Sequence, residues 1–127
     1  MKFTVERAAL VKMLELVGKP AVARKWRDKQ VRLSACAARV FVEANDSTGG
    51  VEALVFQDGT CTLPHAVFLK ILKTYAPKPN ITVEADERVI RFFSTTLPVS
   101  GYSPAVTPPG KFQVFPVTDL RVLRPPP

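Results

Sequence analysis

The sequence predicts an α+β domain in which two helices lie on one side of a curved antiparallel sheet. Two stretches repeat apolar residues at the spacing of a helix, and each is followed by stretches in which apolar and polar residues alternate. This order occurs twice, which predicts two βαβββ-like halves that share one core with quasi-twofold symmetry. The 127 residues fit a single domain. We place it at residues 1–104, followed by a proline-rich C-terminal tail at residues 105–127.

The first half begins with a short strand and an amphipathic helix. Residues 1–5 alternate in the manner of a strand, and an apolar stripe at helical spacing then continues to about residue 17. The members of this stripe are Leu10, Met13, Leu14 and Val17. Gly18 stands where a glycine commonly ends a helix, and Pro20 prevents its continuation.

The strands of the first half follow a basic connection at residues 19–29. From Gln30 the period of the apolar residues changes to two, which predicts strands separated by short turns. Turn residues crowd at 45–50, and Asp58 with Gly59 predicts a hairpin. The strands expected in this region are residues 31–35, 40–42, 51–55 and 60–63.

The second half repeats the pattern. Pro64 suits the first turn of a helix, and prolines at 77 and 79 end it. The apolar face of this helix consists of Val67, Phe68, Ile71, Leu72 and Tyr75. Strands are expected at residues 80–85, 89–94 and 95–102, the last at a sheet edge because Pro98 interrupts it. In the tail, only residues 112–117 and 120–123 are apolar enough to order as extended segments.

Composition excludes several classes of protein. No apolar run approaches the roughly 20 residues that span a bilayer, and the first residues do not form a signal peptide, so we expect a cytoplasmic protein without a membrane partner. Cys36 and Cys61 have neither disulfide-framework nor zinc-site spacing. His65 is the only histidine, with no nucleophile or carboxylate at a recognisable spacing. We therefore expect no enzyme activity, catalytic residue, cofactor or metal.

Positive charge is concentrated near the start of the chain. The net charge is +7, and residues 1–29 carry eight basic and three acidic side chains. Residues 30–105 carry seven of each, so that region is neutral. A basic surface of this kind favours a polyanionic partner, with nucleic acid as the first candidate. The alternative is a solvated face that only keeps the protein in solution.

Three stretches resemble one protein family, the sliding DNA clamps. The opening residues 1–7 (MKFTVER) with Leu10 and Leu14, and residues 62–72 (TLPHAVFLKIL), are similar to the N-terminal domain of the bacterial DNA polymerase III beta subunit. Leu97-Pro98 before the aromatic turn at residues 102–104 is similar to the end of that domain. The resemblance covers about residues 1–104.

The resemblance implies a DNA-clamp-like domain whose helices face duplex DNA. Family rings contain six such domains from two three-domain chains, so either six copies of this chain assemble or no ring forms. Lysine and arginine on the inner face would contact phosphates without reading bases. The residues expected to bind DNA are Arg7, Lys12, Arg24, Lys25, Arg27, Lys29, Lys70 and Lys73.

Three functional hypotheses stay open. The first is a non-catalytic processivity or replication accessory factor that binds double-stranded DNA independently of sequence, with DNA polymerase or other replication proteins as partners. The second is a protein-interaction module that keeps the clamp fold without encircling DNA. A third is a single-strand binder that stacks bases on Trp26, although this tryptophan also suits core or interface packing. Free sheet edges expected at residues 51–56 and 97–102 would allow a homo-oligomer, whereas Pro98 and charge would favour a monomer.

Overall fold

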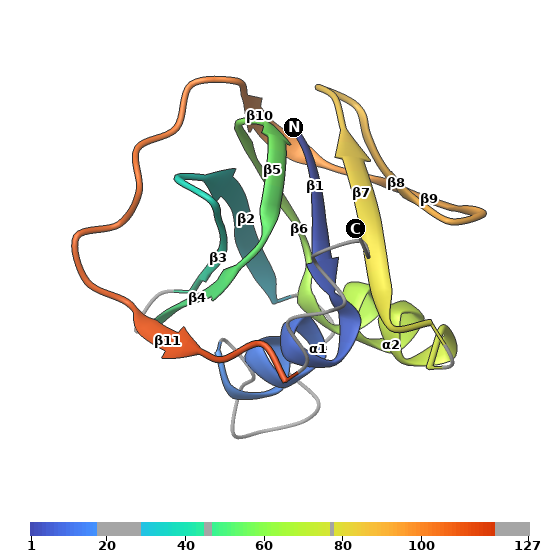
Figure 1. Ribbon diagram of the computed structural model, residues 1–127. Coiled ribbons are helices and arrows are strands. Elements are labelled where there is room, and N and C mark those ends of the chain that lie inside the picture. Colours follow the sequence, from blue (N-terminus) through green and yellow to red (C-terminus); the bar gives the residue numbers. More distant parts are fainter. Residues whose placement is uncertain (18–28, 45–46, 77, 119–127) are drawn as a thin grey trace, which may run out of the picture.

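Two sheets and two helices make up the fold, which a computed structural model describes for residues 1–17, 29–44, 47–76 and 78–118 (Figure 1). The helices are α1 (Arg7–Leu16) and α2 (His65–Thr74). The strands of the first part of the chain are β1 (Lys2–Glu6), β2 (Gln30–Cys36), β3 (Arg39–Glu43), β4 (Thr48–Glu52) and β5 (Leu54–Gln57). The remaining strands are β6 (Gly59–Pro64), β7 (Asn80–Ala85), β8 (Val89–Phe92), β9 (Thr95–Pro98), β10 (Ser100–Ser103) and β11 (Gln113–Phe115).

The predicted α+β class and the two repeated halves are confirmed, but the strands divide between two sheets. Sheet A has the order β5-β1-β7-β8-β9, and sheet B has the order β10-β6-β2-β3-β4-β11. All pairings are antiparallel except that of β11 with β4. Both helices lie next to each other on one side of the molecule (Figure 1).

The two halves exchange their first strands. The first half consists of β1, α1, β2, β3, β4 and β5, and the second of β6, α2, β7, β8, β9 and β10. Strand β1 joins β7 and β8 of the second half in sheet A, whereas β6 joins β2 and β3 of the first half in sheet B. Each sheet therefore contains strands from both halves, an arrangement that the predicted single sheet did not include.

Two stretches predicted as single strands each contribute to both sheets. The stretch 51–55 breaks at Ala53, between β4 of sheet B and β5 of sheet A, and the stretch 95–102 breaks at Val99, between β9 and β10. At both corners a backbone N–H donates a hydrogen bond to a carbonyl of a hairpin turn. Ala53 donates to the carbonyl of Ala38 over 3.0 Å, and Val99 donates to that of Arg88 over 3.0 Å. Val51, Ala53 and Val55 keep a spacing of two across the first corner, and Leu97 and Val99 keep it into the second, so the sequence pattern does not reveal either corner.

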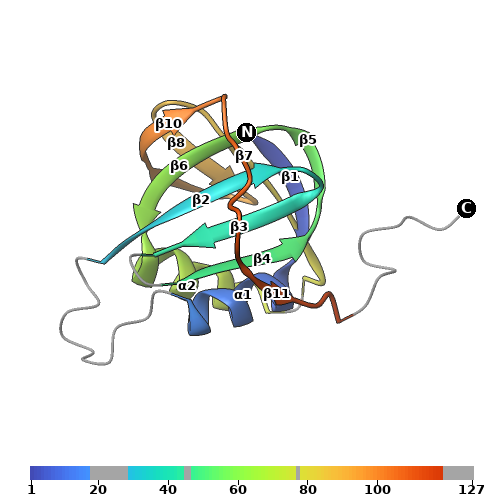
Figure 2. The same ribbon diagram turned by 90° about the vertical axis from the view of Figure 1, so that its left-hand side faces the viewer.

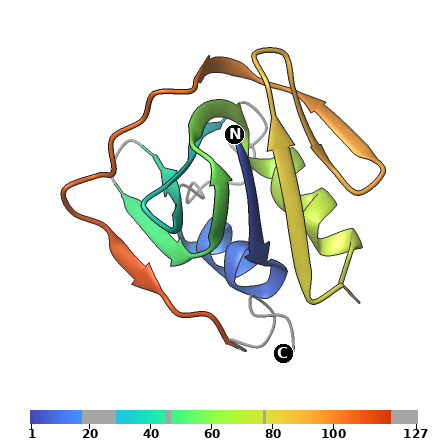
Figure 3. The ribbon, with the colours of Figure 1, turned by 45° about the horizontal axis from the view of Figure 1, so that its top comes forward.

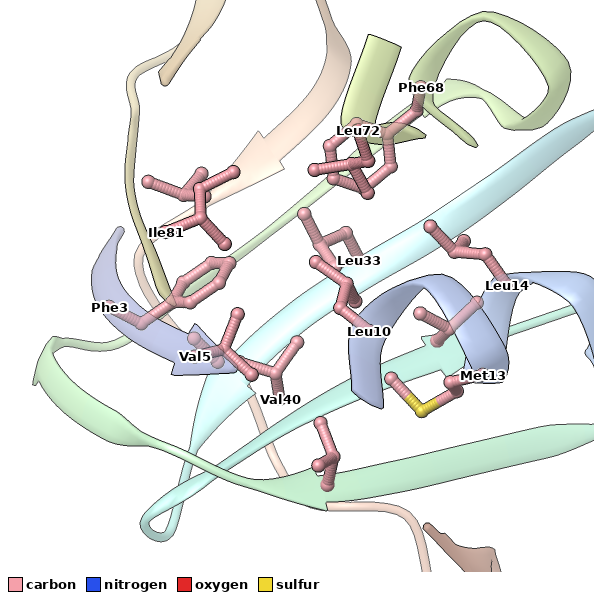
Figure 4. Packing of buried hydrophobic residues seen from close by; sticks show 14 of the residues in the cluster. Phe3, Val5, Leu10, Met13, Leu14, Leu33, Val40, Phe68, Leu72 and Ile81 are labelled. Carbon is pink, nitrogen blue, oxygen red and sulfur yellow. The ribbon is translucent and has the colours of Figure 1, made fainter. Parts of the chain in front are cut away.

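The core lies between the two sheets and the helices (Figure 4). The stripe predicted for the first helix is buried at all four of its positions, and Phe68 and Leu72 anchor the second helix. The rings of Phe68 and Phe92 meet edge to face, with centroids 5.5 Å apart. Each large side chain that is fully buried stabilises the fold by about 1.5–3 kcal/mol through the area removed from water. This packing holds α1 and α2 in fixed positions below the sheets.

The tail returns to the domain after a stretch without regular structure. Residues 104–112 cross the outer face of sheet B, and β11 then lies beside β4 (Figure 2). The view from above shows the same path around the outside of the molecule (Figure 3). Phe115 is buried in the core. The extended segment expected at residues 112–117 is therefore present, whereas that expected at residues 120–123 lies outside the described residues.

Candidate nucleic-acid interface

The two helices bring four of the predicted DNA-binding residues onto one layer of the molecule. Arg7 and Lys12 lie on α1, and Lys70 and Lys73 lie on α2. Lys12, Lys70 and Lys73 are exposed, and Arg7 is half-buried. Glu15 is the only acidic residue on either helix. The helix layer therefore presents an excess of positive charge, while the described acidic residues outside it lie on strands and turns.

An ion pair joins the two helices. The Nζ atom of Lys73 lies 3.0 Å from Oε1 of Glu15, and both side chains are partly exposed. A pair with this exposure contributes at most about 1 kcal/mol to stability, because water screens the charges. Within the described part of the chain, Lys12 and Lys70 make no ion pair. These two lysines are the most available for an external anion.

Arg7 also has a structural role. Its Nε donates to the carbonyl of Lys78 and its Nη2 to that of Ala76, each over 3.1 Å. These carbonyls follow the C-terminal end of α2, so the first residue of α1 holds the end of the other helix. The guanidinium has five N–H donors, and the hydrogen bonds to described residues use two of them.

His65 makes the equivalent contact in the opposite direction. It begins α2, is fully buried, and its Nε2 lies 2.6 Å from the carbonyl of Leu14 and 3.1 Å from that of Val17. A carbonyl only accepts, so Nε2 carries the proton and donates to the end of α1. The only histidine of the sequence thus joins the two helices and is shielded from solvent.

The basic connection contributes only one residue that can be placed. Lys29 is half-buried, and its carbonyl accepts a 3.0 Å hydrogen bond from the backbone N–H of His65. Arg24, Lys25 and Arg27, together with Trp26, lie outside the described residues. The structure thus assembles the helical members of the predicted set.

The two cysteines lie in the interior of the domain. Cys36 and Cys61 are free and buried, and burial raises the pKa of Cys61 to about 11, so that thiol stays protonated. Among the described residues, no group of three or more His, Cys, Asp or Glu side chains is arranged to hold a metal ion. None of the described helices has the length and apolar character needed to cross a membrane.

The sheet edges differ from one another. In sheet A, β5 and β9 are edge strands, and β5 exposes Phe56 to 62% and Leu54 to 39%. In sheet B, β10 is an edge strand. The outer side of β4, by contrast, is covered by β11. The sequence predicted free edges at residues 51–56 and 97–102, but it did not predict that β11 covers β4. The local feature that could have indicated this cover is the pair Gly49 and Gly50, which leaves room for aromatic side chains.

Comparison of the structure with solved structures finds bacterial beta clamps. The match to pol III beta of Caulobacter crescentus has a TM-score of 0.60 and 25% identity, and covers 91% of this chain and 32% of that one. The beta subunit of Streptococcus pyogenes DNA polymerase matches with a TM-score of 0.62 and 16% identity, covering 80% of this chain and 30% of that one. This chain has the fold of one beta-clamp domain.

This chain spans about a third of the length of the clamps that it matches. A further match is the Helicobacter pylori beta clamp bound to a DNA ligase peptide, with a TM-score of 0.60 and 16% identity, covering 79% of this chain and 30% of that clamp. No family model matches the sequence, and no curated protein matches it. The clamp-domain resemblance seen in the sequence is thus confirmed at the level of the fold.

Proposed function

We propose that this clamp domain is a non-catalytic, DNA-associated protein that contacts the backbone of double-stranded DNA through its helix layer. The observation that carries the proposal is the grouping of Arg7, Lys12, Lys70 and Lys73 on two adjacent helices with a single carboxylate among them. A processivity or replication accessory role is the corresponding cellular function, with replication proteins as partners.

The mechanism is electrostatic. Lysine ammonium groups on flexible stems neutralise phosphates and release condensed counterions, so affinity falls as salt rises. Such contacts position the protein on the duplex and carry no sequence information. Lys12 and Lys70 supply one ammonium group from each helix, and neither forms an ion pair with a carboxylate in the described part of the chain. Lys73 lies on the same layer, but its ion pair with Glu15 reduces its contribution to DNA affinity.

The test compares two double variants of equal charge. Duplex binding is followed by fluorescence anisotropy over a salt series, with solution mass measured on the same samples. Lys12→Ala/Lys70→Ala should weaken binding and lower the slope of log K against log salt by about two, roughly one for each lysine removed from a phosphate. Arg88→Ala/Arg91→Ala removes the same charge at the opposite end of the molecule, near the β7–β8 turn (Figure 1).

The control decides between a site and general charge. Equal losses of affinity in the two double variants would show that only net charge matters, and would remove the helix layer as a binding site. Binding by neither the parent protein nor its variants would remove the DNA proposal altogether.

A second candidate is a protein-interaction module with the clamp fold. One observation favours it: the chain's own tail covers the β4 edge. In this case the protein would remain a monomer and would engage a polymerase or a clamp. Solution mass by light scattering over a range of concentrations separates the two functions. A mass six times that of the chain would favour a six-domain ring, and a monomer that ignores duplex DNA would favour the module.

A further inference from the structure

The edge of β4 that pairs with β11 has two glycines, and each of them lies against an aromatic side chain of the tail. A Cβ atom added at Gly49 would lie 2.7 Å from the ring of Phe115, and one added at Gly50 would lie 2.8 Å from the ring of Phe112. Real Cβ contacts are not this short, so any larger residue at either glycine would displace an aromatic ring. The two glycines therefore form two recesses, one on each face of sheet B. These recesses and the edge of β4 between them are called the β4 groove below.

Each recess has a specific lining. On the core side, Phe115 lies with Met13 of α1 over Gly49 and is buried. On the outer face, the ring of Phe112 meets that of Phe41 edge to face at 5.0 Å. The guanidinium of Arg39 lies over the same ring, 5.1 Å from its centroid. Such a cation–π contact adds to the attraction of the aromatic pair.

A third contact fixes the end of the docked segment. Thr118 donates from its backbone N–H over 2.9 Å and from its hydroxyl over 2.6 Å to the same oxygen of the Glu6 carboxylate. Glu6 is almost fully buried. Hydrogen bonds to an ionised acceptor are stronger than neutral ones. Residues 112, 115 and 118 thus engage three features of the domain, while β11 pairs in parallel with β4 between them.

The covalent connection between β10 and the docked segment runs through residues 104–112, which have no regular structure. Prolines at 104, 108 and 109 favour an extended conformation, in which nine residues span about 28 Å. A segment of this kind, once undocked, reaches beyond its own domain. An identical groove on another copy offers it the same interactions, so exchange between two chains preserves all of them.

We propose that the β4 groove is a strand-docking site that accepts residues 112–118 of a second copy of this chain. Two chains then exchange segments and form a dimer. Docking within one chain competes at an effective concentration on the order of millimolar. The dimer therefore becomes abundant only at high protein concentration, or when a chain's own segment cannot dock.

Two complementary full-length variants test the exchange. Phe112→Ala/Phe115→Ala has an intact groove and no anchoring side chains. Gly49→Ala/Gly50→Ala has an intact segment and a filled groove. Each should be a monomer alone, and an equimolar mixture should give a species of twice the chain mass in light-scattering chromatography. The matched control combines all four substitutions in one chain, and it should not associate with the groove-filled variant.

A peptide of residues 111–118 provides a measurement that does not depend on the groove-filled variant being folded. Labelled at its N-terminus, it should bind the Phe112→Ala/Phe115→Ala variant more than tenfold more tightly than it binds the wild type, whose groove is occupied. Far-ultraviolet circular dichroism verifies the fold of each variant. A mixture that stays monomeric although the peptide binds would overturn the second-copy proposal. Failure of the peptide to bind the folded variant would overturn the docking site itself.

Discussion

The two halves of the domain share one topology but use different chemistry at equivalent positions. The helix of the first half begins with Arg7, a half-buried cation, and that of the second with His65, a buried imidazole, yet each holds the end of the other helix. The equivalent strands β4 and β9 differ as well, because β4 is covered by β11 whereas β9 is an open edge. The backbone arrangement thus determines where a contact is needed, and the local environment determines which side chain can make it.

Replacement of His65 should give the largest difference between the halves. His65→Ala leaves two carbonyls at the end of α1 without a donor and creates a cavity, so we expect a loss of about 3 kcal/mol in the free energy of unfolding. Arg7→Ala should cost about 1 kcal/mol, because the exposed backbone at Ala76 and Lys78 can bond to water instead. Urea denaturation of both variants measures the difference. Equal losses would show that burial does not distinguish the two contacts.

Removal of an apolar side chain at each outer edge is the next comparison. Phe115→Ala should cost about 2 kcal/mol, less than the usual value for a core phenylalanine because the segment can undock as a unit. Leu97 on β9 is half-buried, and Leu97→Ala should cost about 1 kcal/mol. Amide hydrogen exchange separates the mechanisms, since only Phe115→Ala should speed exchange in β4. Unchanged protection there would contradict the covering role of β11.

The hairpin turns of the two halves differ in backbone conformation. Ala37 and Ala38, between β2 and β3, both have positive φ values, 51° and 58°. A two-residue turn of this kind favours Asn-Gly, because a Cβ atom is strained at positive φ. Ala37→Asn/Ala38→Gly should therefore raise stability by about 1 kcal/mol, measured as an increase in Tm. A lower Tm would show that the alanine side chains contribute packing that outweighs the strain.

The equivalent turn between β7 and β8 depends on pH. Oδ1 of Asp86 accepts hydrogen bonds from the N–H groups of Val89 and Arg88, and these hold the pKa of the carboxyl below its ordinary value. The stabilisation is therefore complete above the unfolded pKa near 3.8 and is lost as pH falls through the lower folded pKa. Asp86→Asn should lose less Tm than the wild type between pH 5 and pH 2. An identical loss would mean that this carboxylate contributes nothing to acid sensitivity.

The sequence predicted what depends on local periodicity. The helical stripe from Leu10 to Val17 and the strands on either side of the Ala37–Ala38 turn are visible as repeats of three to four and of two. The grouping of Lys12 and Lys70 on one layer also followed, because the halves repeat. Local patterns identify an element but not its neighbours in space.

What the sequence did not reveal depends on contacts between distant residues. Val51, Ala53 and Val55 keep the spacing of a single strand, and nothing local shows that Ala53 turns the chain from one sheet into the other. Arg7 appeared to be a free cation because its acceptors, at Ala76 and Lys78, are about 70 positions away. The cover on β4 depends on the packing of the Phe115 ring against Gly49, and these residues are 66 positions apart.

The exchange of first strands between the halves has a consequence for synthesis of the chain on the ribosome. Strand β1 pairs on one side with β7, with Lys2 opposite Glu84, and on the other with β5. At 5–20 residues per second, β7 is completed roughly 4–16 s after β1. Until then β1 cannot complete sheet A, and the apolar side chains of Phe3 and Val5 have no finished core to enter. The nascent first half therefore exposes these apolar side chains until the second half supplies β6 and β7.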